Sequence, residues 1–282
     1  MLATESYMNL KLPLIKEKTE MQCKMFAVIL TVAVVAIFAL YANMAEAQII
    51  TDGLVSYWTF DETDSDGDTV KDVIGNNDGT LLGAEIVPDG KIDEAVKFNG
   101  GSAYIDCGND TSLDITEEIT IEAWIKLDNL GAGFGTIVGN WTAAADQRNY
   151  ILQTNNDKLD FYYSPGGGGY ENLASATSLT TDWTHVVTVL DEDDTISQYI
   201  NGVKDSKTAN FASPLNDHAQ NFYIGKWAGA EFFNGLIDEV RIYNRALSED
   251  EIKQNYESKI QFAGVEPANK LAITWGETKI KD

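Results

Sequence analysis

The stretch 235–243, Gly-Leu-Ile-Asp-Glu-Val-Arg-Ile-Tyr, contains an aspartate whose chemistry depends on its surroundings. Side chains of a β-strand alternate between two faces, so a strand here puts Asp238 in a row whose other members are apolar: Leu236, Val240 and Ile242. A buried carboxylate is tolerated when it is paired, hydrogen-bonded or bound to a metal. Asp238 is therefore a candidate catalytic acid, ion-pair partner of Arg148 or Arg245, or metal ligand.

Aromatic and polar side chains at strand ends and in loops form a second candidate site. Flat rings can stack on sugar faces while neighbouring amide and guanidinium groups bind sugar hydroxyls. The candidates are Trp141, Tyr163, Tyr170 and Trp227 for stacking, with Asn140 and Arg148 as polar contacts. The alternative is that these rings plug the rim of the core.

Other catalytic chemistry has little support in the sequence. The two histidines are His185 and His218, and His185 alternates with valines, which favours a buried structural histidine over a general base. The glycine run 166–169 lacks the Lys and Ser or Thr that follow in a phosphate-binding loop. Cys107, one of two cysteines, shares a strand face with apolar residues and is interpreted as a small buried hydrophobe.

The segment 61–72 is an acidic loop that begins at Asp61. With Gly67 at the sixth position of an EF-hand template, the twelfth position is Val73, where a bidentate glutamate belongs. We therefore expect a solvated acidic turn, with a second cation site as the alternative.

Short alternating runs separated by turn residues predict the elements that would position these side chains. They are 54–60, 79–81, 95–99, 103–107, 119–126, 136–141, 149–153, 158–163, 184–190, 195–204, 222–226 and 235–243. The run 195–204 is expected to reverse at Asn201 and Gly202, a pair typical of tight hairpin turns. This pattern predicts an all-β sandwich.

One helix is predicted after the last strand. Ser248 and Glu251 have the spacing of a capping box, and Leu247 and Ile252 can form a hydrophobic staple around it. We expect the apolar face of this helix to pack on the sandwich.

Residues 1–47 resemble an export signal in composition. An uncharged apolar run at 25–42 follows a flank that contains lysines and precedes Ala-Glu-Ala at 45–47. We expect cleavage after Ala47 and a secreted, periplasmic or cell-surface product. The alternative is an uncleaved membrane anchor at 25–42, because about 20 apolar residues cross a bilayer.

The net charge of the chain is −24, and residues 1–47 contain as many acidic as basic residues, so the remainder has all of this charge. Such a surface repels phosphate backbones and anionic lipids, which excludes nucleic acid as a partner and limits membrane contact to the N-terminal segment. It favours divalent cations, calcium above all.

Eight segments, in order along the chain, resemble those of a known family: 53–62, 77–81, 96–100, 104–107, 119–125, 183–186, 199–203 and 233–248. They resemble the laminin G-like jelly-roll, or concanavalin A-like lectin and glucanase, domains of bacterial exported proteins. The resemblance implies a two-sheet antiparallel jelly-roll sandwich, concave on one side, over residues 48–263, with one short C-terminal helix. Residues 264–282 would be a tail.

The resemblance also implies a structural calcium ion on the convex side. In relatives the ligands are an Asp of the last strand, a carboxylate near the first strand and a backbone carbonyl. On this sequence they correspond to Asp238, Asp61 and the carbonyl of Gly101. Members of the family bind glycans or proteins, and many are adhesive modules.

Hydrolases of similar fold use a Glu-x-Asp-x-x-Glu strand, which this sequence lacks. We therefore expect an exported, non-catalytic carbohydrate-binding or adhesive module with one structural calcium. One alternative is a glycoside hydrolase or lyase that uses a concave-face carboxylate such as Glu122. The other is a structural surface protein that binds protein partners.

Overall fold

The computed structural model describes residues 48–144, 148–165, 169–210, 214–216 and 220–258. The predicted export signal at 1–47, His218 and the tail at 264–282 lie outside these residues. Within the part of the chain that is described, no helix is long and apolar enough to cross a membrane.

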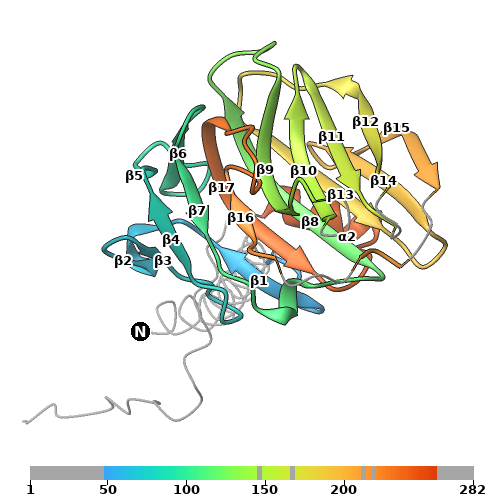
Figure 1. Cartoon of the computed structure of the whole chain (residues 1–282), viewed down its shortest axis with the longest axis horizontal. Coiled ribbons are helices and arrows are strands. Elements are labelled where there is room, and N and C mark those ends of the chain that lie inside the picture. The colour runs from blue at the N-terminus through green and yellow to red at the C-terminus, as the bar shows by residue number, and fades with distance from the viewer. Residues whose placement is uncertain (1–47, 145–147, 166–168, 211–213, 217–219, 259–282) are drawn as a thin grey trace, which may run out of the picture. The chain divides into compact units, whose positions relative to one another are not determined.

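Two antiparallel sheets form the protein (Figure 1). The eight-stranded sheet has the order β15-β14-β13-β8-β17-β6-β5, and β1 also pairs with β17. Its strands are β1 (Leu54–Trp58), β5 (Glu85–Val87), β6 (Ala95–Asn99), β8 (Ile119–Leu127), β13 (Thr184–Leu190), β14 (Thr195–Ile200), β15 (Val203–Asn210) and β17 (Asn234–Tyr243).

The nine-stranded sheet has the order β12-β11-β10-β9-β16-β7-β4-β3-β2. Its strands are β2 (Ser65–Asp66), β3 (Thr69–Val70), β4 (Gly79–Leu82), β7 (Tyr104–Asp106), β9 (Phe134–Trp141), β10 (Arg148–Asn155), β11 (Lys158–Tyr163), β12 (Glu171–Ser178) and β16 (Tyr223–Ile224). Two 3-10 turns, Glu62–Asp64 and Thr111–Leu113, complete the connections.

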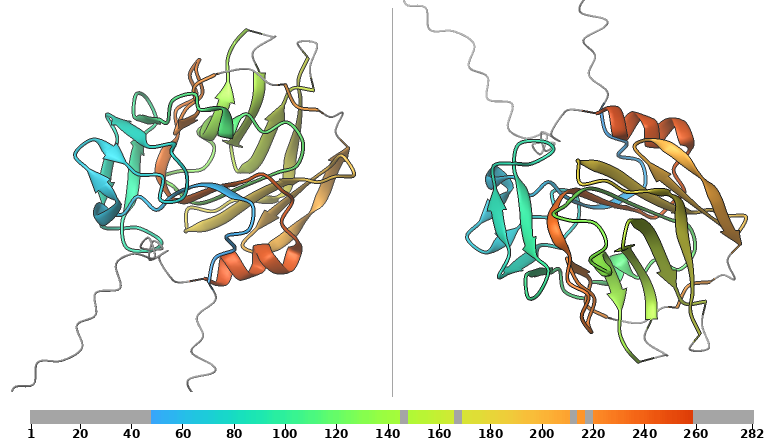
Figure 2. Two further views of the ribbon diagram at one scale, coloured as in Figure 1. Left: turned by 90° about the horizontal axis from the view of Figure 1, so that it is seen from below. Right: turned by 90° about the horizontal axis from the view of Figure 1, so that it is seen from above.

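The two sheets are packed as two layers (Figure 2), and the main hydrophobic core lies between them. This confirms the sandwich predicted from the alternating runs. Alternate residues of the facing strands supply it, including Ile121, Ala123 and Ile125 from β8 and Leu159, Phe161 and Tyr163 from β11. Burial of these apolar side chains is the main force that holds the sheets together.

A second apolar cluster lies on the outer side of the eight-stranded sheet, under the helix α2 (Glu249–Glu257). The predicted capping box is present, because Ser248 Oγ accepts from the Glu251 amide and the Glu251 carboxylate accepts from the Ser248 amide. Leu247 and Ile252 are buried together in this cluster, which also contains Tyr57 and Tyr243. The predicted helix and its packing are confirmed.

The hairpin predicted at Asn201 and Gly202 is also confirmed, with both residues at positive φ (53° and 73°) between β14 and β15. The strand β12 was not predicted. It lies at the edge of its sheet and has few large apolar side chains, so its sequence has little alternation to detect.

The predicted alternation of the last strand is wrong at its centre. The pairing of β17 with β8 shifts between Asp238 and Arg241, and Glu239 has φ 55°, which marks a β-bulge. Ile237, before the bulge, and Val240, after it, both face the core between the sheets. Asp238 therefore does not share a face with Val240.

Candidate functional site

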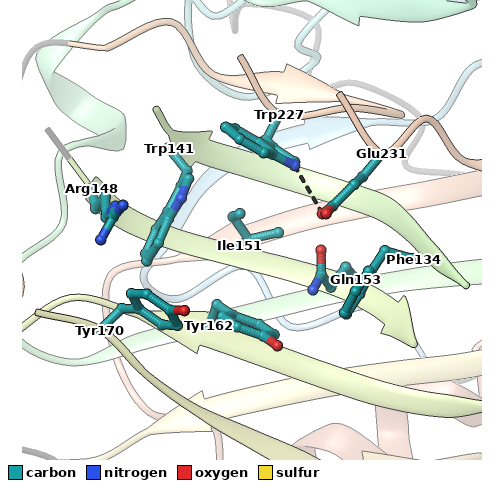
Figure 3. A pocket seen from close by; sticks show the side chains of 9 residues that line it. All are labelled: Phe134, Trp141, Arg148, Ile151, Gln153, Tyr162, Tyr170, Trp227 and Glu231. Atoms are coloured by element: carbon teal, nitrogen blue, oxygen red, sulfur yellow. Dashed lines mark hydrogen bonds between the residues drawn. The ribbon is translucent and has the colours of Figure 1, made fainter. Parts of the chain in front are cut away.

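The open face of the nine-stranded sheet has a pocket of about 260 Å³ (Figure 3). Its walls come from β9, β10 and β11, from the segment before β12 and from the loop between β16 and β17. The lining residues are Phe134, Trp141, Arg148, Ile151, Gln153, Tyr162, Tyr170, Trp227 and Glu231.

Strand alternation decides which side chains reach this pocket. In β10, Tyr150 and Leu152 belong to the core while Ile151 and Gln153 line the pocket. Because successive side chains of a strand point to opposite faces, the packing of the core fixes the floor of the pocket.

Aromatic rings form the walls. The centroids of Tyr162 and Tyr170 are 5.8 Å apart with an interplanar angle of 34°, and Trp141 meets Tyr170 edge to face at 6.0 Å. Phe134 packs edge to face on Tyr162 at 6.4 Å. Tyr170 is 54% exposed and Phe134 42% exposed, so parts of these rings face solvent.

One cation and one anion lie at opposite ends of the pocket (Figure 3). The Arg148 guanidinium carbon lies 5.5 Å from the Trp141 ring centroid and 5.1 Å from that of Tyr170, within cation–π range. Arg148 Nη2 also donates to the carbonyl of Ala143 at 3.2 Å. These contacts hold the guanidinium beside the rings.

The anion belongs to a tight loop that also presents Trp227. Trp227 Nε1 donates to Glu231 Oε2 at 2.9 Å, and Glu231 has a positive φ of 63°. The indole folds back over Gly229, where a Cβ would lie 2.1 Å from the ring, so this position requires glycine. The loop thus fixes one aromatic ring and one carboxylate on the rim.

Four of the six predicted glycan contacts line this pocket: Trp141, Arg148, Tyr170 and Trp227. Tyr163 does not, because its ring lies in the core, stacked on Phe161 at 5.9 Å. Asn140 does not either, since it is fully buried and its amide donates to Asp114. Both predictions erred because position near a strand end does not reveal which face a side chain takes.

Five residues line the pocket but were not predicted: Phe134, Ile151, Gln153, Tyr162 and Glu231. For Tyr162 a signal was available. Leu159, Phe161 and Tyr163 alternate as an apolar row, which assigns Tyr162 to the opposite, open face. The position of Glu231 in the pocket depends on a loop conformation that the sequence does not specify.

The two aspartates of the predicted calcium site are both buried, and one loop covers them. Asp238 Oδ2 accepts from the amides of Lys91 and Ile92 at 2.8 and 3.0 Å, and Asp61 Oδ1 accepts from the Glu94 amide at 3.3 Å. Asp238 Oδ1 is buried with no hydrogen-bond partner among the described residues. Asp238 also forms no ion pair with a described residue, so the structure does not support the ion-pair alternative.

Burial controls the electrostatics of this pair. It raises the pKa of Asp61 to about 6, and burial followed by repulsion from Glu239 raises the pKa of Asp238 well above its usual value. Asp61 also raises the pKa of Asp238, because its negative charge repels the charged form of Asp238. Negative charge at this position is therefore disfavoured unless a cation offsets it.

No described hydrogen bond joins Gly101 to these aspartates. Its amide donates to Asn99 Oδ1 at 3.0 Å, and the residue is exposed and lines a second pocket. The main-chain groups that contact the aspartates come from residues 91, 92 and 94 instead. Among the residues with described positions, no group of three or more His, Cys, Asp or Glu side chains could hold a metal ion.

Glu122, named as a candidate catalytic carboxylate, is fully buried beneath α2. Its oxygens contact Arg241 Nη1 and His185 Nε2, both at 2.8 Å, and Asn255 Nδ2 at 2.7 Å. Although burial disfavours its charged form, Arg241 and His185 hold the pKa of Glu122 at about 2. Glu122 is thus a structural ion-pair partner on the side of the eight-stranded sheet that faces away from the core.

The same buried cluster contains Glu239, which pairs with Arg241 and accepts from the Tyr57 hydroxyl at 2.5 Å. Burial raises the pKa of Glu239 to about 7 even with Arg241 beside it. His185 lies in this cluster against Trp124 and Tyr256, as a buried histidine. The predicted burial of His185 is confirmed.

In the acidic loop, Asp72 is the main structural carboxylate. It accepts from the amides of Tyr57, Ile74, Gly75 and Asn77. Asp66 and Asp68 are exposed, as expected of a solvated turn.

The fold and pocket define an all-β jelly-roll sandwich with an aromatic site on one sheet. The chain belongs to the concanavalin A-like lectin/glucanases superfamily, whose family model matches residues 99–253. A comparison with curated proteins found no match.

Several solved structures share the fold. The binding domain of Paraclostridial Mosquitocidal Protein 1 has a TM-score of 0.59 and 20% identity, covering 73% of this chain and 52% of that one. Domain 4 of an extracellular arabinanase from Geobacillus stearothermophilus, in complex with arabinotriose, has a TM-score of 0.55 and 23% identity, covering 72% of this chain and 98% of that one. Trypanosoma rangeli sialidase, in complex with 2,3-difluorosialic acid, has a TM-score of 0.58 and 21% identity, covering 80% of this chain and 36% of that one.

The chain thus spans about half of the mosquitocidal binding domain and about a third of the sialidase. At these identities the likeness concerns the fold, and a shared fold does not imply a shared activity.

Proposed function

We propose that this protein is an exported, non-catalytic carbohydrate-binding or adhesive module. The observation that carries the proposal is the pocket of aromatic rings on the open face of the nine-stranded sheet, with Arg148 and Glu231 at its ends. Partly exposed rings give flat apolar surfaces for sugar C–H groups, while the charged and amide side chains bind hydroxyls. The composition of residues 1–47 supports export.

The arrangement of carboxylates supports binding over hydrolysis. Glycoside hydrolysis generally uses two carboxyl groups on either side of the scissile bond. Among the nine residues that line the pocket, the single carboxylate is Glu231, and it already accepts a hydrogen bond from Trp227. Glu122 is buried on the far side of the other sheet.

We also propose that Asp61 and Asp238 hold a structural calcium ion. Two buried carboxylates, one with an oxygen that lacks a hydrogen bond to any described residue, are the donor type that calcium prefers. The ion would stabilise the charged forms of both, and main-chain carbonyls and water would complete its shell. Bound there, it would tie the last strand to the segment after the first.

The binding proposal is tested with the whole chain from residue 48 onward on a panel of plant and marine polysaccharides. Affinity gel electrophoresis should show retardation in at least one polysaccharide, and reducing-sugar assays should show no release. Release of reducing sugar would establish an enzyme. A glycan array that stays blank at high protein concentration, with capture of a protein partner, would favour a structural protein instead.

A further inference from the structure

A second pocket adjoins the aromatic pocket. It measures about 390 Å³, and its lining includes Phe134 and Glu231, which also line the first. Two pockets that share two wall residues are neighbours on the surface. The other residues used below are Asn99, Asn129, Thr154, Asn156 and Asn234.

The second pocket begins where β10 ends. Arg148, Ile151 and Gln153 line the first pocket on the open face of the sheet, whereas Thr154, whose side chain alternates to the opposite face, and Asn156, just beyond the strand, line the second. Figure 3 shows Arg148 at one end of the first pocket and Phe134 with Glu231 at the other. Phe134 and Glu231 are the two residues that also line the second pocket. At a rise of ~3.3 Å per residue, β10 alone extends roughly 23 Å from Arg148 to Asn155, which is long enough for several consecutive sugar rings.

The second pocket differs from the first in chemistry. It is rich in side-chain amides, and those of Asn129 and Asn234 form no hydrogen bond with other described residues. Amides both donate and accept, which suits the hydroxyl groups of a sugar. The amide of Asn99, in contrast, is used to hold the turn at 101–103.

The charges of the two pockets balance. Together they are lined by one cation, Arg148, and one carboxylate, Glu231, on a chain whose net charge is −24. A polyanionic polysaccharide would find one compensating cation in the two pockets and would be repelled by the net negative charge of the protein. An uncharged chain meets neither obstacle.

We propose that the two pockets form one groove that binds an internal run of an uncharged linear polysaccharide. The aromatic pocket stacks on sugar rings at one end, and the amide pocket binds hydroxyls of later rings at the other. This inference rests on the proposed carbohydrate-binding function and adds the length and charge of the bound chain.

The test is isothermal titration with oligosaccharide ladders, from disaccharide to hexasaccharide, of cellulose, xylan, arabinan and laminarin, with oligogalacturonates as the anionic comparison. For the ladder that binds, affinity should rise with each added sugar beyond the disaccharide. In the double variant Asn129→Ala with Asn234→Ala, hexasaccharide affinity should fall about 2- to 10-fold for each amide removed, with disaccharide affinity unchanged.

Asn109→Ala is the matched control, since Asn109 is exposed and lies outside both pockets. It should change neither affinity. Equal affinity for disaccharide and hexasaccharide, or a double variant with unaltered hexasaccharide binding, overturns the extended groove but leaves the binding function intact. Tighter binding of oligogalacturonates overturns the uncharged class, and no binding by any ladder contradicts both proposals.

Discussion

Tyr162 and Tyr163 are consecutive residues of β11, and their rings lie on opposite sides of the nine-stranded sheet. The Tyr162 ring lies 5.8 Å from that of Tyr170 in the open pocket, whereas the Tyr163 ring is buried on Phe161 and its hydroxyl donates to Glu171 at 2.9 Å. One strand therefore supplies side chains to both the core and the pocket. Substitutions of Tyr162 and Tyr163 can be compared to separate effects on binding from effects on packing.

Tyr162→Ala should weaken glycan binding by about 2 kcal/mol, or roughly 30-fold, because it removes a central wall of the pocket. Tyr163→Phe should leave binding within twofold, since the buried ring is retained and Tyr163 does not line the pocket. Titration with the retained polysaccharide gives both values. Equal losses in the two variants would contradict the assignment of the pocket.

Removal of calcium should destabilise the protein. With EDTA the thermal midpoint should fall by several degrees, because two buried carboxylates lose the cation that offsets their charge. Elemental analysis should show one calcium per chain after dialysis against a calcium buffer.

The variant Asp238→Asn distinguishes a carboxylate that binds calcium from a carboxylate that is buried without a ligand. If the carboxylate binds calcium, the variant unfolds at a lower temperature in calcium and no longer responds to EDTA. If it does not, removal of a buried charge leaves the midpoint equal or higher. An EDTA-insensitive wild type together with a stabilised variant would end the calcium proposal.

Glu122 should stabilise the protein at neutral pH and lose this effect in acid. Its pKa is about 2 in the folded chain, below its ordinary value of 4.5, so the stabilisation is complete above about pH 4.5 and is lost as the pH falls toward 2. The full effect is about 3 kcal/mol. Urea unfolding of wild type and Glu122→Gln at pH 7, 5 and 3 measures it.

The difference in unfolding free energy between these two proteins should be clearly smaller at pH 3 than at pH 5. Subtraction of the variant cancels titrating groups remote from Glu122. Glu239, whose pKa of about 7 is raised in part by Glu122, does not cancel between pH 7 and 5, so the change between pH 5 and 3 reports the charge of Glu122. A difference that stays constant down to pH 3 would show that the charge of Glu122 is not what stabilises the fold.

Arg241→Met should cost about 3–5 kcal/mol in unfolding free energy, because it leaves Glu122 and Glu239 buried without their shared cation. Arg245→Met is the matched control. Arg245 pairs with Glu251 near the surface, where an ion pair contributes up to about 1 kcal/mol. Similar losses in both variants would contradict a special role for the buried cluster.

The sequence alone determined the architecture of this protein. Alternation in runs such as 119–126 and 158–163 predicted the sandwich, and the Ser248 capping box predicted α2, because these signals are local and depend on residues a few positions apart. The same local reasoning placed Trp141, Arg148, Tyr170 and Trp227 among the candidate binding residues.

Only the tertiary structure decided which side chains meet. The bulge at Glu239 changes which side chains of β17 point into the core. Tyr162, and not Tyr163, lines the pocket. The loop at 90–94 contacts Asp61 and Asp238, where Gly101 was expected. Glu122 and Arg241, 119 residues apart, pair because β8 and β17 are neighbours. Such contacts depend on strand order, register and loop conformation across the whole chain, which the spacing of residues in one segment does not encode.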